Sequence, residues 1–218
     1  MADYIQKLKS VLKGSTAIYV DASNLESSVR EMWVNPKDIP NDLKHFESDK
    51  LCWRVDYEKL KLFFENICPV IRIAFYTPDF NTESQQRFLW FLKKKLKFTL
   101  ISKPLKEYSD HSSDNPHRKA NFDVELAVDA SLSHEDYDTM VLFSGDCDFE
   151  YLLKRLRGIN KNTIVFSRAG HIAKELPPAC NEYFDIIDFR HEILSIKKAP
   201  DAKNPLRGNG EDPAVNVR

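Results

Sequence analysis

The stretch Val141-Leu-Phe-Ser-Gly-Asp-Cys-Asp-Phe149 joins an apolar run to two carboxylates that are separated by a single residue. Short apolar runs rich in β-branched and aromatic residues are typical of buried strands, so residues 139–143 are predicted to form one. Asp146 and Asp148 would then lie on the turn that leaves this strand. We expect Gly145, between the strand and the acids, to let the backbone turn sharply.

Working outward from this stretch, short strand-like segments alternate with helical patterns along most of the chain. The other strands are predicted at residues 16–20, 69–76, 98–101, 162–166 and 183–187. The helices are predicted at residues 25–33, 56–66, 82–97, 122–132, 149–157 (with Gly158 as its C-cap), 169–176 and 189–196. This alternation predicts an α/β fold with a mainly parallel central sheet that helices cover on both faces.

Composition suggests the limits of the domain. Residues 1–15 mix charged and apolar side chains without a long apolar core, which predicts an amphipathic N-terminal helix and not a signal peptide. Residues 16–197 are predicted to form the domain, with an insertion loop at 34–54 and a mobile loop at 104–118. Residues 198–218 are polar and rich in Pro and Gly, and we expect them to be disordered.

The overall charge of the chain points to no particular class of partner. Its 218 residues include 32 basic and 33 acidic side chains, so a nucleic-acid surface would have to be a local patch. The four cysteines have no CxxC spacing, which argues against a zinc or dithiol site and suits a reducing compartment. No run approaches the roughly 20 apolar residues of a membrane span. We therefore expect a soluble, cytoplasmic protein without a membrane partner, and no sequence feature supports a homo-oligomer.

Acidic residues also occur at two other points of the predicted sheet edge. Asp21 ends the first predicted strand, and Asp123 begins the helix that precedes strand 139–143. In a parallel sheet the carboxyl ends of the strands share one edge, where ligands bind, so all four acids are expected in one crevice. Close carboxylates repel one another, and a divalent cation removes this penalty. Because Mg²⁺ and Mn²⁺ prefer oxygen ligands, the four aspartates predict a site for one of these ions, which could activate a water molecule for hydrolysis.

Each acid also has an ordinary local explanation. Asp146 or Asp148 could cap the following helix. Asp21 could close an Asx-turn, and Asp123 could complement the dipole of its helix. Their coincidence at one predicted edge favours the metal site over these separate roles.

Three motifs resemble those of NYN-domain proteins of the LabA-like branch, which belong to the wider PIN-like nuclease class. They are Val20-Asp21-Ala-Ser-Asn24, Phe122-Asp123-Val-Glu-Leu-Ala-Val-Asp129-Ala130 and Leu142-Phe-Ser-Gly-Asp146-Cys-Asp148-Phe149. The resemblance covers roughly residues 16–190. It implies a three-layer α/β/α Rossmann-like (PIN-like) fold and metal-dependent cleavage of phosphodiester bonds, usually in RNA. It further implies that the catalytic and metal-binding residues are Asp21, Asp123, Asp146 and Asp148, supported by Asn24 and Ser144.

Basic residues near this edge are candidate contacts for nucleic acid. Arg118 and Lys119 lead into the helix of Asp123, and Arg168 follows the fifth predicted strand. Members of the family commonly have Lys-Gly before the second motif, whereas Lys119 lies one residue farther away. Arg168 could instead form a salt bridge with a site acid. The run of Lys93, Lys94, Lys95 and Lys97 is most simply a solvated helix face.

These observations predict a metal-dependent nuclease, in the first place an endoribonuclease, with RNA as substrate and DNA as the alternative. A second hypothesis is a catalytically silent regulatory or nucleic-acid-binding module with the same fold. The near-neutral charge and the displaced Lys119 favour this second hypothesis.

Overall fold

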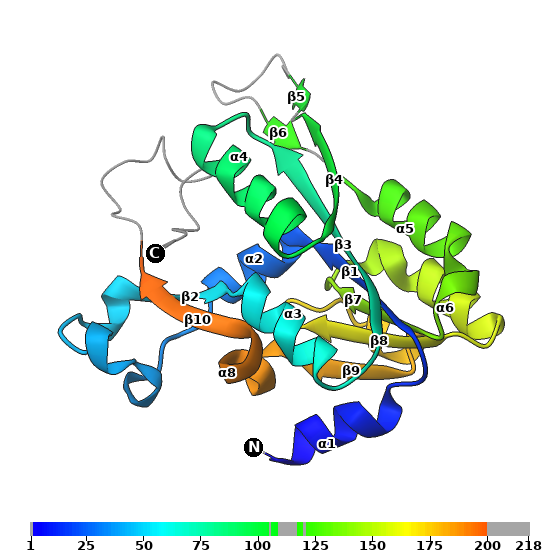
Figure 1. Cartoon of the computed structure of the whole chain (residues 1–218), viewed down its shortest axis with the longest axis horizontal. Helices are drawn as coiled ribbons and strands as arrows, with labels where there is room; N and C mark the ends of the chain where they lie inside the picture. The colour runs from blue at the N-terminus through cyan, green and yellow to red at the C-terminus, as the bar shows by residue number, and fades with distance from the viewer. Residues whose placement is uncertain (1, 105, 109–116, 120, 200–218) are drawn as a thin grey trace.

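A computed structural model describes residues 2–104, 106–108, 117–119 and 121–199 (Figure 1). Its centre is a six-stranded sheet in the order β4-β3-β1-β7-β8-β9, in which every neighbouring pair is parallel. The strands are β1 (Thr16–Asp21), β3 (Val70–Asp79), β4 (Thr99–Pro104), β7 (Thr139–Phe143), β8 (Asn162–Ser167) and β9 (Glu182–Asp185). The predicted α/β fold with a mainly parallel sheet is confirmed.

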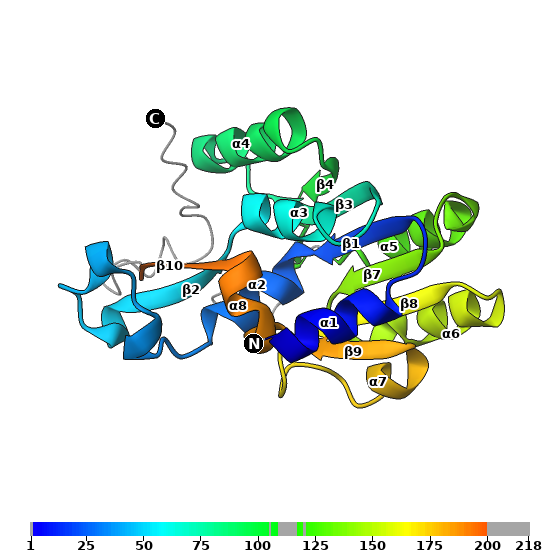
Figure 2. The same ribbon diagram turned by 60° about the horizontal axis from the view of Figure 1, so that its bottom comes forward.

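Helices cover both faces of this sheet (Figure 2). They are α1 (Ala2–Val11), α2 (Ala22–Arg30), α3 (Tyr57–Glu65), α4 (Glu83–Trp90, continued by a π-helical turn, Phe91–Lys95), α5 (Asp123–Leu132), α6 (Glu150–Gly158), α7 (Leu176–Ala179) and α8 (Arg190–Ile193). Side chains alternate between the faces of a strand, so Ile18 and Val20 join one core and Ala17 and Tyr19 the other. The first core takes in α1, α2, α3, α4 and α8, and the second takes in α5, α6 and α7, which gives three layers.

The strand order changes direction between β1 and β7. The chain runs from β1 to β3 and β4 on one side, and later forms β7, β8 and β9 on the other side. Val20 lies opposite Phe143 in the register of β1 and β7, so the two strands end side by side. Connections that leave neighbouring strands in opposite directions open a ligand-binding crevice at the carboxyl ends of those strands. Asp21 and Asp146 follow these two ends.

Two predicted helices are wrong. Residues 169–175 form no helix, and α7 begins at Leu176, so that Pro177 and Pro178 lie in its first turn. Proline fits there because the first amide nitrogens of a helix have no intrahelical hydrogen-bond partner. The predicted helix at 189–196 is instead a 3-10 turn (Ile186–Phe189), the single turn of α8, and strand β10 (Leu194–Lys198).

The C-terminal end of α6 also differs from the prediction. Gly158 lies inside the helix, and Asn160 takes the left-handed conformation with φ 61°. The amide of Asn160 donates to the Arg157 carbonyl (3.0 Å), and the amide of Lys161 donates to the Leu156 carbonyl (2.9 Å). These two bonds close the helix as a Schellman motif, in which Asn replaces the more common Gly.

The insertion at 34–54 is more ordered than a loop. It contains three single 3-10 turns, Pro36–Asp38, Asn41–Leu43 and Ser48–Lys50, and most of strand β2 (Leu51–Val55). Strand β2 pairs antiparallel with β10, from Leu51 opposite Lys198 to Val55 opposite Leu194. The two strands and the 3-10 turns form one end of the molecule (Figures 1 and 2).

Three other boundaries need correction or lie outside the described residues. Strand β3 continues past its predicted end at residue 76, because β4 pairs with it as far as Asp79. The loop predicted at 104–118 holds a hairpin of β5 (Lys106–Tyr108) and β6 (His117–Lys119), while residues 105 and 109–116 lie outside the described residues. Of the predicted disordered tail, Lys198 ends β10, and residues 200–218 are outside the described part.

Candidate metal and nucleic-acid site

Asp21 is the last residue of β1 and caps α2. Its Oδ1 accepts a hydrogen bond from the Asn24 amide (3.2 Å), and its Oδ2 accepts one from the Ser144 hydroxyl (3.1 Å). Burial raises the pKa of Asp21, the bonds from Asn24 and Ser144 oppose this rise, and the charge of Asp146 adds to it. Asp21 is therefore both a helix cap and a partner of residues that follow β7.

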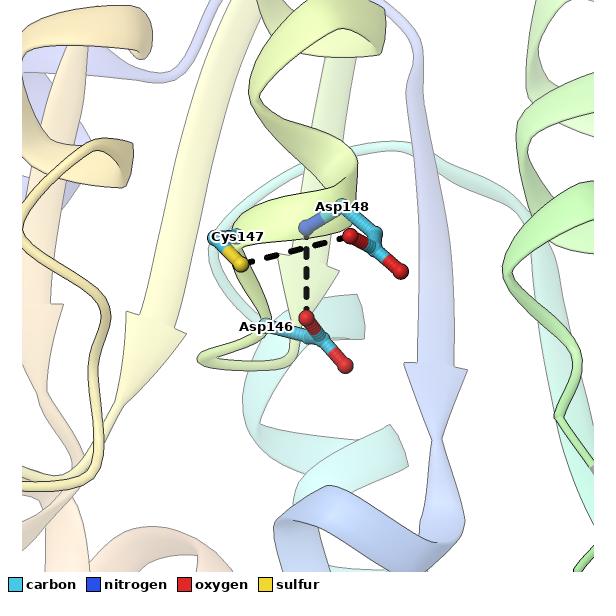
Figure 3. A group of neighbouring side chains, drawn as sticks. All are labelled: Asp146, Cys147 and Asp148. Carbon is cyan, nitrogen blue, oxygen red and sulfur yellow. Dashed lines mark hydrogen bonds between the residues drawn. The ribbon is translucent and has the colours of Figure 1, made fainter.

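Asp146 and Asp148 lie on a 3-10 turn, Cys147–Phe149, that follows β7 (Figure 3). The amide of Asp146 donates to the Ser144 hydroxyl (3.2 Å), and the amide of Asp148 donates to Asp146 Oδ1 (3.2 Å). In Figure 3 the two carboxylates project to the same side, while Cys147 starts from the opposite side of the turn. Ligand atoms of Asp146, Cys147 and Asp148 lie within 4.8 Å of one another, and no group this tight takes in other described residues.

Cys147, between the two acids, is exposed. Partial desolvation, followed by the charges of Asp146 and Asp148, raises the pKa of the thiol. The sulfur therefore stays a neutral thiol near pH 7, which is a poor ligand for Mg²⁺ or Mn²⁺. The oxygen atoms of the two acids remain the candidate ligands on this turn.

Asp123 is the first residue of α5, and its amide donates to Asn121 Oδ1 (3.0 Å). Its Oδ2 is buried and has no hydrogen-bond partner among the described residues. The pKa of Asp123 rises to about 6, first through burial and then through the charges of Asp146, Asp21 and Asp148, while the side chain of Asn121 lowers it. The charges of all three other acids therefore act on the Asp123 carboxyl group. Asp123 does not belong to the group of ligand atoms within 4.8 Å of one another that Asp146 and Asp148 form with Cys147.

A hydrogen bond between Gly145 and Asn24 links the segments that follow β1 and β7. The amide of Gly145 donates to Asn24 Oδ1 (2.9 Å), and its carbonyl accepts from the Ala173 amide (2.9 Å). A Cβ on Gly145 would lie 2.2 Å from the carbonyl oxygen of His171. Glycine is required at this position by the close approach of another backbone, not by the sharp turn that we expected from the sequence. Asn24 therefore supports Asp21 through its backbone and Gly145 through its side chain.

Residues 15–188 match the NYN domain family. The chain belongs to this family. It is 34% identical over 156 residues to the "Low amplitude and bright protein LabA" of Synechococcus elongatus, which covers 70% of this chain and 83% of LabA. Its fold is similar to the crystal structure of a protein of unknown function from Vibrio parahaemolyticus, with a TM-score of 0.64 and 23% identity over 84% of this chain and 97% of that one. Among the described residues of this NYN domain, no helix has the length and apolar character needed to cross a membrane.

Of the basic residues predicted for this NYN domain, Arg168 does not contact the acids. Arg168 donates to the Ser28 carbonyl (3.1 Å) and lies 3.8 Å from Glu31, so the carboxylate beside it belongs to the end of α2 and is not a site acid. His171 lies 3.0 Å from the same carboxylate of Glu31. The backbones of Arg118 and Lys119 lie on β6, shortly before Asn121.

Sequence reasoning missed two residues next to Asp123. Phe122 is at the N-cap position of α5 but has no side chain that could cap the helix, and Asn121 accepts the hydrogen bond from the Asp123 amide. The sequence signal for this role was an Asn two positions before Asp123. Lys103, near the end of β4, lies 2.6 Å from Glu125 and 4.6 Å from the centre of the Phe122 ring. It was overlooked because the third strand was predicted to end at residue 101.

The raised pKa of Asp123 should make the stability of the metal-free NYN domain depend on pH. Its folded-state pKa of about 6 lies above the ordinary value of 3.8, so between these values the folded chain keeps a proton that the unfolded chain loses. Stability should therefore fall as the pH rises from about 4 through about 6. With divalent ions removed, Asp123→Asn should stabilise the domain at pH 8 by about 1 kcal/mol, a value reduced for partial exposure.

Thermal unfolding at pH 8 and pH 4 measures this effect. At pH 4 the Asp123 carboxyl is already protonated in the folded state, so the gain should disappear. Asp136→Asn, at an exposed position on a 3-10 turn, is the matched control and should show no such pH-dependent gain. An equal gain from Asp123→Asn at both pH values would contradict the assignment.

Proposed function

We propose that this NYN domain is a metal-dependent endoribonuclease whose catalytic and metal-binding residues are Asp21, Asp123, Asp146 and Asp148. The observation that supports this most is the buried Oδ2 of Asp123, which has no hydrogen-bond partner among the described residues. A buried carboxylate oxygen without a partner is rare in native proteins and needs an explanation. A cation shared with the other three acids, whose charges raise the pKa of Asp123, supplies one.

The chemistry of the donors fits Mg²⁺ or Mn²⁺. Both ions prefer carboxylate oxygen, and the side chains of Asp146 and Asp148 project together from one turn. When bound, such an ion lowers the pKa of a water molecule and stabilises charge on a phosphoryl oxygen. Ser144 orients Asp21 toward the turn after β7, and Asn24 holds the Gly145 amide, so the acids of both strand ends keep a fixed spacing.

We further propose RNA as the substrate, held by basic residues around the acids. Arg118 and Lys119 lie on β6 just before α5, and Lys103 lies beside Phe122. These side chains could bind phosphate groups on either side of the scissile bond. Arg168 could do so after releasing its contacts with α2 and Glu31.

A specific observation favours the second candidate, a binding module that cleaves nothing. Among the side chains that the structure describes, which do not include those of Arg118 and Lys119, no lysine or arginine has a hydrogen bond or ion pair with any of the four acids. Nucleases commonly stabilise the charge of the transition state with such groups as well as with metal ions. An NYN domain that keeps the acidic crevice without these cations could bind a metal and nucleic acid without turnover.

Labelled RNA and DNA of the same sequence, each incubated with Mn²⁺, with Mg²⁺ or with a chelator, separate the two candidates. A ribonuclease should produce RNA fragments only with a divalent ion, and should leave DNA largely intact. A silent module should retard RNA in a native gel in the presence of the ion and produce no fragments. Cleavage that persists in the chelator would contradict a metal-dependent mechanism.

A further inference from the structure

A second site lies at the opposite edge of the sheet from the four acids. It is a pocket of about 540 Å³ lined by Lys13, Lys154, Arg157, Gly158, Asn160, Lys161, Asn162 and Asn181. Lys13 precedes β1, Asn162 begins β8 and Asn181 precedes β9, so the pocket lies at the amino ends of these parallel strands. The acids follow the carboxyl ends, and the two sites therefore do not share a wall. In Figure 1 the amino ends of β8 and β9 and the end of α6 lie on the right-hand side.

The pocket is cationic, and the residues that line it include four basic side chains and no acid. Two of the cations are held by main-chain carbonyls, which fix them without neutralising them. Lys161 Nζ donates to the Tyr137 carbonyl (2.8 Å). Arg157 Nη1 donates to the carbonyls of Pro178 (2.9 Å) and Ala179 (3.0 Å). The Schellman turn at the end of α6 fixes the backbone between Arg157 and Lys161.

The other two cations are freer. Thr139 Oγ1 accepts from the Lys13 amide (3.0 Å) and donates to its carbonyl (2.6 Å), which anchors the backbone. The ammonium group of Lys13 has no partner among the described residues. Lys154 forms an ion pair with Glu150 at 2.5 Å, in which the Lys154 side chain is exposed and the Glu150 side chain is half-buried. Ion pairs near the surface contribute little to stability, so an anion could draw Lys154 away at small cost.

Local negative charge does not cancel these cations. The C-terminal end of α6 carries the negative pole of its helix dipole, roughly half a charge. This pole stabilises basic side chains near the end of the helix and offsets part of their charge. Asp138 lies close to Lys161, and both the amide (2.9 Å) and the hydroxyl (3.0 Å) of Ser15 bind its carboxylate. Asp138 and Glu150 together offset two of the four positive charges, and the pocket keeps an excess.

Asn181 adds a hydrogen-bond donor to this excess charge. Its Oδ1 accepts from both the amide (2.9 Å) and the hydroxyl (3.0 Å) of Thr163, which fixes the orientation of the side chain. No described residue accepts a hydrogen bond from the side-chain nitrogen of Asn181, so its two protons can be donated to a ligand in the pocket. Fixed cations, mobile lysines and a free amide donor together suit an anion with several oxygen atoms.

We propose that this pocket binds the phosphate groups of a nucleotide or of an RNA strand, independently of the acidic site. The volume suits a ligand of nucleotide size. The lining has no aromatic side chain on which a base could stack, so recognition rests on the phosphates. Since divalent ions are not needed here, binding should persist in a chelator and should weaken as the salt concentration rises.

Isothermal titration of the full chain in EDTA tests this proposal, with pyrophosphate, ADP and a 5′-phosphorylated RNA dodecamer as separate probes. The double variant Lys13→Ala/Lys154→Ala should weaken binding about tenfold or more, as expected when two charge-assisted contacts are lost. The control Lys93→Ala/Lys94→Ala removes the same charge from the exposed surface after α4, and should bind like the wild type. Unchanged melting temperatures establish that both variants are folded.

The three probes identify the source of the phosphate. Tight binding of pyrophosphate and ADP indicates a small-molecule site, whereas binding of the dodecamer alone indicates a nucleic-acid strand. If the pocket variant binds every probe as tightly as the control variant, or if both variants lose affinity equally, the proposal is overturned. Because EDTA removes divalent ions, neither result depends on whether the acidic site cleaves RNA.

Discussion

Replacement of Asp146 by Asn should lower the rate of divalent-dependent RNA cleavage by at least about 100-fold, because it removes the charge of a carboxylate that we propose as a metal ligand. The substitution can preserve the fold, since the oxygen of the new side-chain amide could still accept the bond that Asp146 accepts from the Asp148 amide. The measurement is the initial rate of cleavage of a labelled RNA in Mn²⁺, together with Mn²⁺ affinity by calorimetry. Both should fall in the variant, while its melting temperature in a chelator should not.

The matched control for this variant is Asp56→Asn. Asp56 caps α3 and accepts from the Lys59 amide (3.1 Å), so it has the same local role as Asp146 but does not belong to the four-acid site. Its replacement should leave cleavage and Mn²⁺ affinity unchanged. If Asp146→Asn cuts RNA as fast as this control does, Asp146 is a helix cap and the proposed site is wrong.

Gly145→Ala should destabilise the protein by about 1–3 kcal/mol, the range typical of a forced steric overlap. The new Cβ would lie 2.2 Å from the His171 carbonyl oxygen and 2.6 Å from the Ser167 hydroxyl. A side chain could rotate away, but the carbonyl belongs to the main chain of the segment that binds Gly145 through Ala173. The midpoint of urea unfolding should therefore fall markedly.

The same substitution at Gly158 separates steric overlap from the general effect of adding a methyl group. Gly158 lies in α6, and a Cβ there would have no neighbouring atom within 4 Å. Gly158→Ala should stabilise the protein by about 0.5–1 kcal/mol, since alanine favours helix more than glycine does. Equal urea midpoints for the two variants would show that the segment around His171 can move away freely.

The strands of the sheet and the order of the acids could be predicted from the sequence because both follow from local patterns. Short apolar runs identified all six strands of the central sheet, and the acids at two strand ends lie at the carboxyl ends of the neighbouring strands β1 and β7. Ser144 was named through a family resemblance. Its actual contact, a hydrogen bond to Asp21, required the pairing of β1 with β7.

The errors arose where distant contacts determine the structure. Strand β10 was predicted as helix because residues 194–198 form a strand only when β2 is beside them. The role of Gly145 was misread because the His171 carbonyl, which excludes a side chain, approaches from another loop. Arg168 lies at the predicted edge, but its carboxylate neighbour is Glu31 at the end of α2, and no local pattern indicates that choice.

The pairing of β2 with β10 also has a consequence for the order of folding. Leu51 pairs with Lys198, so the backbone of β2 can form its strand hydrogen bonds only after almost the last described residue is in place. Contacts between residues so far apart in sequence have a high entropic cost of loop closure and tend to form late. During synthesis on the ribosome, the central sheet can assemble while β2 still lacks its partner strand. We expect the pairing of β2 with β10 to be among the last contacts to form.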